Sequence, residues 1–404
     1  MTIAFVSYEY PPETGGGGIG TYLFQCVKWL PAYGHEIVVF CATAASEAFW
    51  ENEFVYRIPA SDWDSFNRIL PTYFTQVHKE RKFDIAEGTD FRAGGIEIMK
   101  IFPDLPFVVK AHSANYIVDK YLFRPISGWQ KIRFALGALK QGRLPSFPKP
   151  PAPEQYPREK EILQKCDQVI SPSMSLGDMY VQLGWAKDYA LVPYLFHPSA
   201  SVLKISPLKE KIKLDIVFYG RLEMRKGVVT LAKSIPFVIQ KYKNVHFHFI
   251  GNPSNSPQYG VPMDQYLENK LKKYKKYVTI RKAVPPEQVP EILEMGDIFV
   301  FPSLYDSFGL VCCEAMAAGK AVIGSKSGGM AEIIEEGVSG LLVTPKNVLE
   351  LASKIMDLIA RPEKRILLGQ QGRKRIRELY HPDVIIPQQI ELYEKVVRHK
   401  IQAQ

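Results

Sequence analysis

Two acidic residues, Asp306 and Glu314, lie eight positions apart in the stretch "YDSFGLVCCEAMAAGK" (305–320), with a glycine between them. The stretch follows the apolar run "DIFVFPS" (297–303), which is typical of a buried strand, so the acids fall where a strand ends and a helix begins. Carboxylates at such a place accept hydrogen bonds from sugar hydroxyl groups. The alternative interpretation is structural, with Asp306 capping the helix and Glu314 acting as a solvated charge.

Groups that favour a phosphate follow two of the expected strands. The segment "YGRLEMRKG" (219–227) places Arg221 and Lys226 five residues apart. A guanidinium fork and a mobile ammonium suit a diphosphate, and they stabilise the charge that develops if the diphosphate leaves. The backbone amides of residues 308–310, at the start of the helix after Asp306, also point toward an anion. The alternative is a pair of surface bases beside a glycine turn.

The first half of the chain contributes a glycine tract and a histidine. The segment "PPETGGGGIGTYL" (11–23) follows the first expected strand, and its glycines let the backbone approach a ligand in front of a helix. The G-x-G-x-x-G spacing of dinucleotide sites is missing, so a flexible turn is the alternative. His112 follows the strand-like run "PFVVKA" (106–111), where it would hydrogen-bond a ligand or act as an acid–base group. A structural histidine remains the alternative.

These residues need strands that end at common edges, and the chain has them. Short apolar runs alternate with helical patterns, which indicates parallel sheets covered by helices on both faces. The expected strands are residues 2–8, 36–40, 83–87, 106–111, 167–171, 213–220, 245–251, 277–280, 297–303, 321–325 and 340–343. Eleven strands would overfill one open sheet, so the expected fold class is α/β with two doubly wound, Rossmann-like domains. The polar, proline-containing segment 196–211 marks their boundary.

Composition agrees with two globular domains and leaves the partner open. The chain has 404 residues, 46% of them hydrophobic and 23% charged, and a net charge of +9. Such a charge favours a polyanionic partner such as nucleic acid, anionic lipid or a phosphorylated substrate, although solubility alone also explains it. Five cysteines without paired spacing speak against disulfides and a zinc site. With no signal peptide or spanning segment in the sequence, a cytoplasmic protein is expected.

Several spaced motifs resemble the retaining glycosyltransferases of family 4, which have the GT-B fold. The family's run G-R-L…K-G is present from Gly220 to Gly227, and its long second motif is similar to "DIFVFPSLYDSFGLVCCEAMAAGKAV" (297–322). A third motif corresponds to "GGMAEIIEEGVSGLL" (328–342). The resemblance covers nearly the whole chain and is strongest in its second half. It implies an acceptor-binding domain at 1–200, with 383–404 packing back on it, and a donor-binding domain at 201–382.

The resemblance also implies roles for individual residues. Arg221 and Lys226 would bind the nucleotide diphosphate, Glu314 the ribose, and Asp306 the transferred sugar. Further donor contacts would come from Gly17, Gly18, Lys282, Val284, Phe308, Gly309 and Leu310, and His112 would lie near the sugar. Asp306 stands where the family usually has the longer Glu, which leaves the identity of the sugar open. Lys320, and "PYLFHPSA" (193–200) before the boundary, also depart from the family pattern.

The implied reaction is hexose transfer with retention of configuration, by front-side attack and without a dedicated nucleophile. Neither a metal nor another cofactor is expected, because Arg221, Lys226 and a helix dipole replace the charge of a cation. Family frequency favours UDP-glucose or a related UDP-hexose as donor, with GDP-mannose second, and a saccharide or lipid-linked acceptor. The basic, aromatic segment 121–157 suits an amphipathic helix on the cytoplasmic face of an anionic membrane. A helix packed over the first sheet is the alternative.

Three rival functions are distinguishable. A sugar-nucleotide epimerase on the same architecture would isomerise the nucleotide sugar without any transfer; a phosphorylase would need a cofactor lysine and a much longer chain. A non-enzymatic scaffold that uses the positive charge predicts steep salt dependence of polyanion binding and no effect of changing Glu314. The sequence contains no motif that reads RNA or DNA, so no nucleic-acid partner is expected.

Overall fold

The computed structural model describes residues 1–15, 17–122, 128–129, 132, 135–136, 156–206 and 211–403. The chain divides into two compact units. Unit 1 comprises Met1–Tyr116, Pro153–His197 and Arg377–Gln404, and unit 2 comprises Ile117–Ala152 and Pro198–Ile376. The sequence-based division placed residues 117–152 in the first domain, and most of this range lies outside the described residues.

Unit 1 is built on one sheet, whose described strands run in the order β3-β4-β2-β1-β5-β6-β7-β8. Neighbouring strands are parallel, except that β3 pairs with β4 antiparallel. The strands are β1 (Thr2–Val6), β2 (Glu36–Thr43), β3 (Phe49–Trp50), β4 (Val55–Pro59), β5 (Ile85–Thr89), β6 (Phe107–Lys110), β7 (Gln168–Ser171) and β8 (Ala190–Leu191). Most central strands are fully buried runs of apolar residues, as expected for a sheet covered on both faces.

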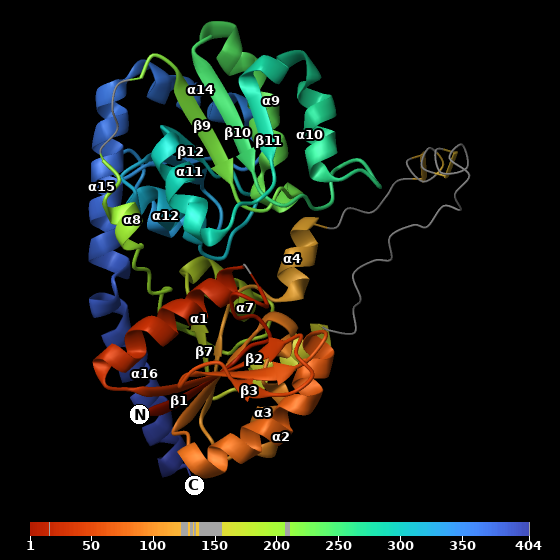
Figure 1. The fold of residues 1–404 in the computed structure, drawn as a ribbon, viewed down its shortest axis with the longest axis vertical. Coiled ribbons are helices and arrows are strands. Elements are labelled where there is room, and N and C mark those ends of the chain that lie inside the picture. The colour runs from red at the N-terminus through yellow and green to blue at the C-terminus, as the bar shows by residue number, and fades with distance from the viewer. Residues whose placement is uncertain are drawn as a thin grey trace. The chain divides into compact units, whose positions relative to one another are not determined.

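Helices cover this sheet (Figure 1). They are α1 (Gly18–Trp29), α2 (Trp63–Arg81), α3 (Ile96–Ile101), α4 (Asn115–Leu122), α6 (Tyr156–Lys165), α7 (Met174–Gln182) and α16 (Pro382–Gln402), with α4 crossing the boundary between the units. A capping box between Asp62 and Ser65 starts α2. The last helix, α16, returns to unit 1, where the Tyr393 hydroxyl donates to buried Glu87 at 2.5 Å.

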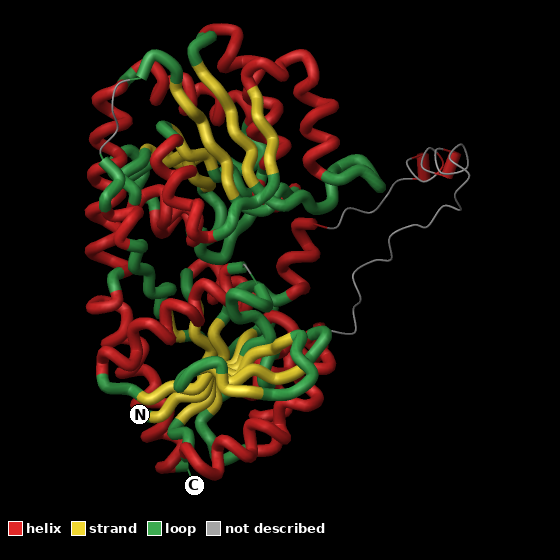
Figure 2. Tube along the Cα trace, in the orientation of Figure 1, coloured by secondary structure: helices red, strands yellow, loops and turns green. Residues whose placement is uncertain are grey.

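Unit 2 repeats the plan with a sheet in the order β11-β10-β9-β12-β13-β14, parallel throughout its described strands. The strands are β9 (Leu214–Tyr219), β10 (Val245–Ile250), β11 (Val278–Arg281), β12 (Ile298–Val300), β13 (Ala321–Ser325) and β14 (Leu341–Val343). The helices are α8 (Ala200–Leu203), α9 (Val228–Lys241), α10 (Met263–Leu271), α11 (Val289–Met295), α12 (Leu310–Ala317), α13 (Met330–Ile333), α14 (Val348–Ala360) and α15 (Pro362–Tyr380). Figure 2 separates the strands of each sheet from the helices around them.

All eleven expected strands are present, and the doubly wound α/β class is confirmed. Three strands were not expected: β3, β4 and β8. β3 and β8 are only two residues long, and β4 contains Arg57 and Pro59, which interrupt the apolar pattern. In the described part of the chain, no helix combines the length and apolarity needed to cross a membrane.

Candidate active site

The predicted phosphate-binding bases follow β9, at the carboxyl edge of the unit 2 sheet. Gly220 turns the chain with φ 130°, and the side chain of Arg221 is 65% exposed to solvent. Lys226 ends a short 3₁₀ turn, and Gly227 follows with φ 74°. A Cβ at Gly227 would lie 1.8 Å from the Pro302 carbonyl oxygen, so only glycine allows this turn to pack against the end of β12.

This packing brings Lys226 to Asp306. The Lys226 ammonium lies 2.5 Å from Asp306 Oδ2, and both side chains are largely buried. Burial alone would raise the pKa of Asp306, but the Lys226 ammonium and the Arg225 guanidinium hold it below its usual range. Burial lowers the pKa of Lys226, although Asp306 opposes the shift. The pair is therefore an ionised ammonium–carboxylate contact in which both groups have lost most of their water.

Three neighbouring features fix the loop that carries Asp306. Arg225 is buried, forms an ion pair with Glu223 at 2.7 Å, and accepts at its backbone oxygen from the Leu304 amide at 2.7 Å. On the other side, the Gly329 amide donates to the Asp306 carbonyl at 2.8 Å. A Cβ at Gly328 would lie 2.1 Å from that carbonyl oxygen, so the paired glycines pack directly on the loop. The loop is therefore held by backbone hydrogen bonds as well as by the ion pair between Lys226 and Asp306.

The loop leads into α12, which begins at Leu310 after Gly309 with φ 112°. Phe308 is buried, and Gly309 packs against the side chain of Met330. The first amides of an α-helix have no partner within the helix, and they carry its positive dipole end. Phe308, Gly309 and Leu310 lie at the start of α12, at the same edge of the sheet as Lys226, and their binding of the donor stays a prediction.

Glu314 lies one turn further along α12 and contacts Tyr219 at the end of β9. The Tyr219 hydroxyl donates to Glu314 Oε2 and lies 3.0 Å from the Val311 carbonyl oxygen. Burial raises the pKa of Glu314 to about 7, and the Tyr219 hydroxyl bond opposes the shift. Glu314 is therefore a partly protonated carboxyl at neutral pH, held in one orientation by a strand residue.

Lys282 and Val284, which were predicted to contact the donor, follow the edge strand β11 at the same carboxyl edge. Lys282 is exposed and Val284 is half-buried. The Gly251 amide donates to the Arg281 carbonyl at 3.0 Å, and a Cβ at Gly251 would lie 1.8 Å from the Gly220 carbonyl oxygen. This chain of backbone contacts links the end of β11 to the turn that precedes Arg221.

In unit 1, Gly17 and Gly18 open α1. Residue 16, just before them, lies outside the described residues. Gly17 occupies the capping position in an extended conformation. Glu9 lies against this segment, because a Cβ at Gly17 would be 3.3 Å from Glu9 Oε2 and a Cβ at Gly15 only 2.6 Å from Glu9 Cβ. The side chain that approaches Gly15 and Gly17 here is acidic, and the predicted approach of a ligand to these glycines stays a prediction.

His112 follows β6 and is held by groups on other elements of unit 1. Its amide donates to Asp90 Oδ1 at 2.7 Å, and the Ser113 amide donates to Asp90 Oδ2 at 3.0 Å. The Tyr194 hydroxyl lies 2.6 Å from His112 Nδ1 and 3.0 Å from the Ala111 carbonyl oxygen. Burial, and then the nearby Lys110 ammonium, lower the pKa of His112 well below its usual value. The imidazole is therefore neutral at physiological pH.

The structure thus brings Lys226 to Asp306 and shows Glu314 against a strand residue, while His112, Gly17 and Gly18 belong to unit 1. Sequence reasoning missed four supporting residues: Tyr219, Arg225, Asp90 and Tyr194. Tyr219 and Asp90 directly follow the buried cores of expected strands, and this position was a usable signal. Tyr194 had no local signal, because its partner His112 lies 82 residues away in sequence, and the nearby Glu223 that pairs with Arg225 did not by itself mark Arg225 as part of the site.

Two other features of the described residues complete the survey. No cluster of three or more His, Cys, Asp or Glu side chains in the described ranges could hold a metal ion. A cavity of about 630 Å³ lies at the amino end of the unit 2 sheet, lined in part by Lys211, Lys241 and Arg365. It contains none of the predicted site residues, which follow the carboxyl ends of the strands.

Comparison with known proteins matches both halves of the chain. Residues 16–194 match the family described as "Glycosyltransferase Family 4", and residues 203–375 match "Glycosyl transferases group 1". The spore coat protein SA of Bacillus subtilis is 32% identical, over 98% of this chain and 100% of that protein. The alpha-maltose-1-phosphate synthase of Mycolicibacterium smegmatis is 29% identical, with the same coverage.

Solved structures show the same fold. Sucrose-phosphate synthase from Thermosynechococcus elongatus superimposes with a TM-score of 0.73 at 22% identity, over 98% of this chain and 99% of that one. Anabaena HepE, solved in complex with UDP and glucose, superimposes with a TM-score of 0.67 at 17% identity, over 98% and 100% of the two chains.

Proposed function

Because this chain belongs to the family 4 glycosyltransferases and has their GT-B fold, we propose that it transfers a hexosyl group from a nucleotide sugar with retention of configuration. The observation that carries the proposal is the arrangement after β9 and β12, where Lys226 contacts Asp306 and Tyr219 contacts Glu314. One edge of one sheet thus presents a cation, two carboxyl groups and helix amides. These are the groups that a sugar joined to a nucleoside diphosphate needs.

We assign the two carboxyl groups to different parts of the donor. Glu314 accepts hydrogen bonds from the two ribose hydroxyls, with Tyr219 fixing its orientation. Asp306 accepts from a hydroxyl of the transferred sugar. Lys226 and Arg221 bind the diphosphate, which requires that the ammonium of Lys226 be shared with, or released from, Asp306. The aspartate is one methylene shorter than the usual glutamate, which suits this tight contact with Lys226.

The proposed step needs no cofactor and balances without one. The bond between the sugar C1 and the diphosphate oxygen breaks, and a bond from an acceptor oxygen to C1 forms on the same face. The acceptor proton passes to the departing phosphate oxygen, whose charge Lys226, Arg221 and the α12 amides stabilise. In unit 1, we assign neutral His112 a hydrogen bond to the sugar, and Gly17 and Gly18 backbone contacts with the diphosphate.

For the donor we propose UDP-glucose or a related UDP-hexose, with GDP-mannose second, and for the acceptor a saccharide or a lipid-linked saccharide. The mycobacterial relative is named for maltose-1-phosphate, so sugar phosphates belong in the acceptor panel. Contact of segment 121–157 with an anionic membrane stays a prediction, because most of that segment lies outside the described residues. Co-sedimentation with vesicles containing anionic lipid tests it.

The test of the proposed function is thermal unfolding with a panel of nucleotides and nucleotide sugars, all in the presence of a chelator. At one hundred times Kd, a bound nucleotide stabilises the protein by about 2.7 kcal/mol. We expect one base to raise Tm in wild type and in Glu268→Ala, a control that removes an exposed carboxylate of unit 2, but not in Glu314→Ala. An equal rise in Tm in all three proteins would refute the assignment of Glu314 to the nucleotide site.

The same samples, incubated with candidate acceptors, decide the reaction. NMR of the product should show the anomeric configuration of the donor, with the chelator leaving the rate unchanged. Isomerised nucleotide sugar without transfer would select an epimerase instead. No stabilisation by any nucleotide, together with salt-dependent binding to polyanions, would select a scaffold.

A further inference from the structure

Arg57 is a fully buried arginine whose role the proposed function does not explain. It lies in the middle of β4, which pairs with β2 on one side and with β3 on the other. Its exposed fraction is 0%, so its guanidinium cannot touch a substrate. A charged side chain so deep in a unit needs hydrogen bonds, and each of the three guanidinium nitrogens of Arg57 donates at least one.

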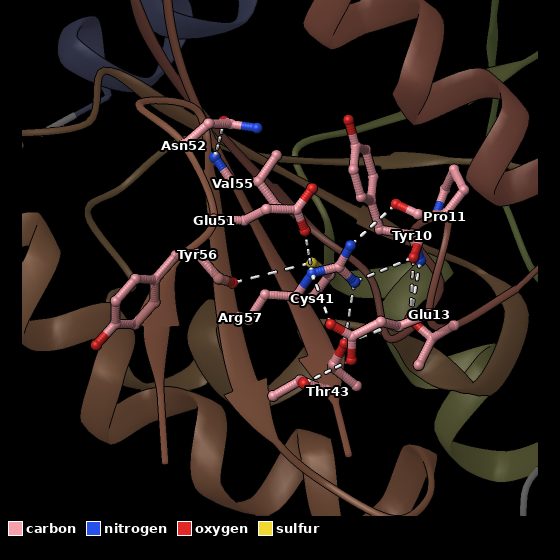
Figure 3. A network of polar contacts seen from close by, with 12 residues as sticks. Tyr10, Pro11, Glu13, Cys41, Thr43, Glu51, Asn52, Val55, Tyr56 and Arg57 are labelled. Carbon is pink, nitrogen blue, oxygen red and sulfur yellow. Dashed lines mark hydrogen bonds and ion pairs between the residues drawn. The ribbon is translucent and has the colours of Figure 1, made fainter. Parts of the chain in front are cut away.

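The guanidinium donates mainly to backbone oxygens of the segment that joins β1 to α1. Arg57 Nη1 donates to the Tyr10 carbonyl at 3.1 Å, and Nη2 donates to the Pro11 carbonyl at 2.9 Å. Nη1 also lies 3.2 Å from the Ala42 carbonyl at the end of β2. Figure 3 shows the fork of Arg57 pointing toward Tyr10 and Pro11. One side chain thus ties the start of the segment to β2 and β4.

Two acidic side chains balance the charge of Arg57. Glu51 Oε2 accepts from Arg57 Nε at 2.6 Å, and Glu13 Oε1 lies 3.9 Å from the same nitrogen. Glu13 also accepts from the Thr43 hydroxyl at 2.5 Å, which anchors the segment to β2 a second time (Figure 3). With two carboxylates against it, the guanidinium has no spare positive charge to attract an anion. Its effect must pass through the backbone that it holds.

That backbone ends where the glycine tract begins. Thr14 closes a bridge with Tyr10, and its hydroxyl donates to the Tyr8 carbonyl at 2.8 Å. Residues 15–18 are all glycine, so no side chain of their own limits their conformation. The described glycines of this tract, Gly15, Gly17 and Gly18, lie between two fixed ends, Thr14 on one side and helix α1 on the other. Arg57 holds the first of these ends.

We propose that Arg57 is a positioning residue for the described glycines of the tract, Gly15, Gly17 and Gly18, acting through the backbone of Tyr10 and Pro11. This inference rests on the proposed function only where it assigns a consequence for transfer. Release of the Tyr10–Thr14 anchor lets the glycines sample many paths, and a displacement of about 1 Å costs on the order of 100-fold in rate when a reacting group is misplaced. The segment's order itself is measurable without any substrate.

The test compares Arg57→Lys with Arg365→Lys. Lysine keeps the charge but cannot donate to three carbonyls in a fixed fork. Arg365 is a matched control, because it is also buried, belongs to unit 2, and donates to the Leu358 and Ile359 carbonyls. Glu51→Gln, a milder change at a partly exposed partner of Arg57, gives a second route should Arg57→Lys fail to fold.

Amide hydrogen exchange of peptides covering residues 8–20 is the first readout. We expect exchange there to rise at least tenfold in Arg57→Lys and by a smaller factor in Glu51→Gln, with no change in Arg365→Lys. The second readout is transfer: kcat should fall at least tenfold in Arg57→Lys while Kd for the bare nucleotide, whose proposed site lies in unit 2, stays within twofold. Arg365→Lys should have the same kcat and the same nucleotide Kd as wild type.

The outcomes separate this inference from the proposed function. Unchanged exchange in both Arg57→Lys and Glu51→Gln overturns the inference, whatever the activity. Raised exchange with unchanged kcat in an active enzyme also overturns it, because the held segment would then not matter for transfer. If wild type neither binds a nucleotide nor transfers a sugar, the proposed function fails, and the exchange result still decides whether Arg57 orders the segment.

Discussion

Nucleotide affinity should depend on pH through Glu314. Burial raises the pKa of this carboxyl to about 7 in the unliganded chain, so it is half protonated at neutral pH. Two ribose hydroxyls donate to a carboxylate more strongly than to a protonated acid, because only the ionised group accepts at both oxygens with full charge. Binding therefore favours the ionised form and releases a proton, and affinity should rise as pH rises through 7.

The size of the effect follows from the pKa. With a pKa near 7, about one Glu314 in eleven is ionised at pH 6 and about ten in eleven at pH 8. If the complex keeps Glu314 ionised at both pH values, Kd should fall about tenfold from pH 6 to pH 8, or about 1.4 kcal/mol. The other titratable groups near this carboxyl, Tyr219 and Cys313, have raised pKa values and stay neutral over this range.

Isothermal titration calorimetry with the nucleotide sugar found in the panel measures this change. A nucleotide sugar has no free terminal phosphate, so the ligand itself contributes no ionisation near pH 6, as a nucleoside diphosphate would. Repeating the titration at pH 7 in buffers of different ionisation enthalpy should show release of about half a proton per site. Glu314→Gln should bind more weakly, with a Kd that is flat from pH 6 to pH 8. A flat Kd in wild type, or the same slope in Glu314→Gln, refutes the reasoning.

Three further predictions concern neighbouring groups. Asp306→Ala leaves the buried Lys226 ammonium without its carboxylate, so the free energy of unfolding should fall by about 3–5 kcal/mol in a denaturant titration; a loss below 1 kcal/mol would show that the pair is not formed in solution. Tyr219→Phe removes a hydrogen bond that favours ionised Glu314, so the rise in nucleotide affinity should move to higher pH, and an unmoved curve would contradict the bond. The imidazole of His112 should still give the NMR signal of its neutral form at pH 6.5, whereas a titration midpoint near 6.5 would contradict its burial.

The sequence predicted the sheets well because most of their strands are buried on both faces. Such strands are short, continuous apolar runs, and each of the eleven that met this pattern is a strand. The missed strand β4 has the sequence "VYRIP", with Arg57 at its centre. An arginine there normally argues against a buried strand, and it is tolerated only because carbonyls of other segments satisfy its donors. The feature that hid the strand is the one that carries the further inference.

The sequence predicted which strand ends carry the candidate site residues. It did not predict which of their side chains contact one another. Parallel strands place their carboxyl ends at one edge, so Lys226 and Asp306 were expected at the same edge. Their direct contact joins residues 80 positions apart, and no local pattern encodes it. The contact between Tyr219 and Glu314 likewise depends on how α12 packs beside β9, which only the folded chain determines.

The Lys226–Asp306 contact also gives a physical reason for the unusual aspartate. A lysine buried without a partner would lose its proton or destabilise the fold, and Asp306 keeps it charged in the unliganded chain. In the proposed reaction, the charge of the diphosphate would replace that of Asp306 as the partner of Lys226. The aspartate oxygen would then become available to a hydroxyl of the transferred sugar. On this proposal, one short carboxylate holds the cation ready before the donor binds and orients the sugar afterwards, as the ammonium moves from one anion to the other.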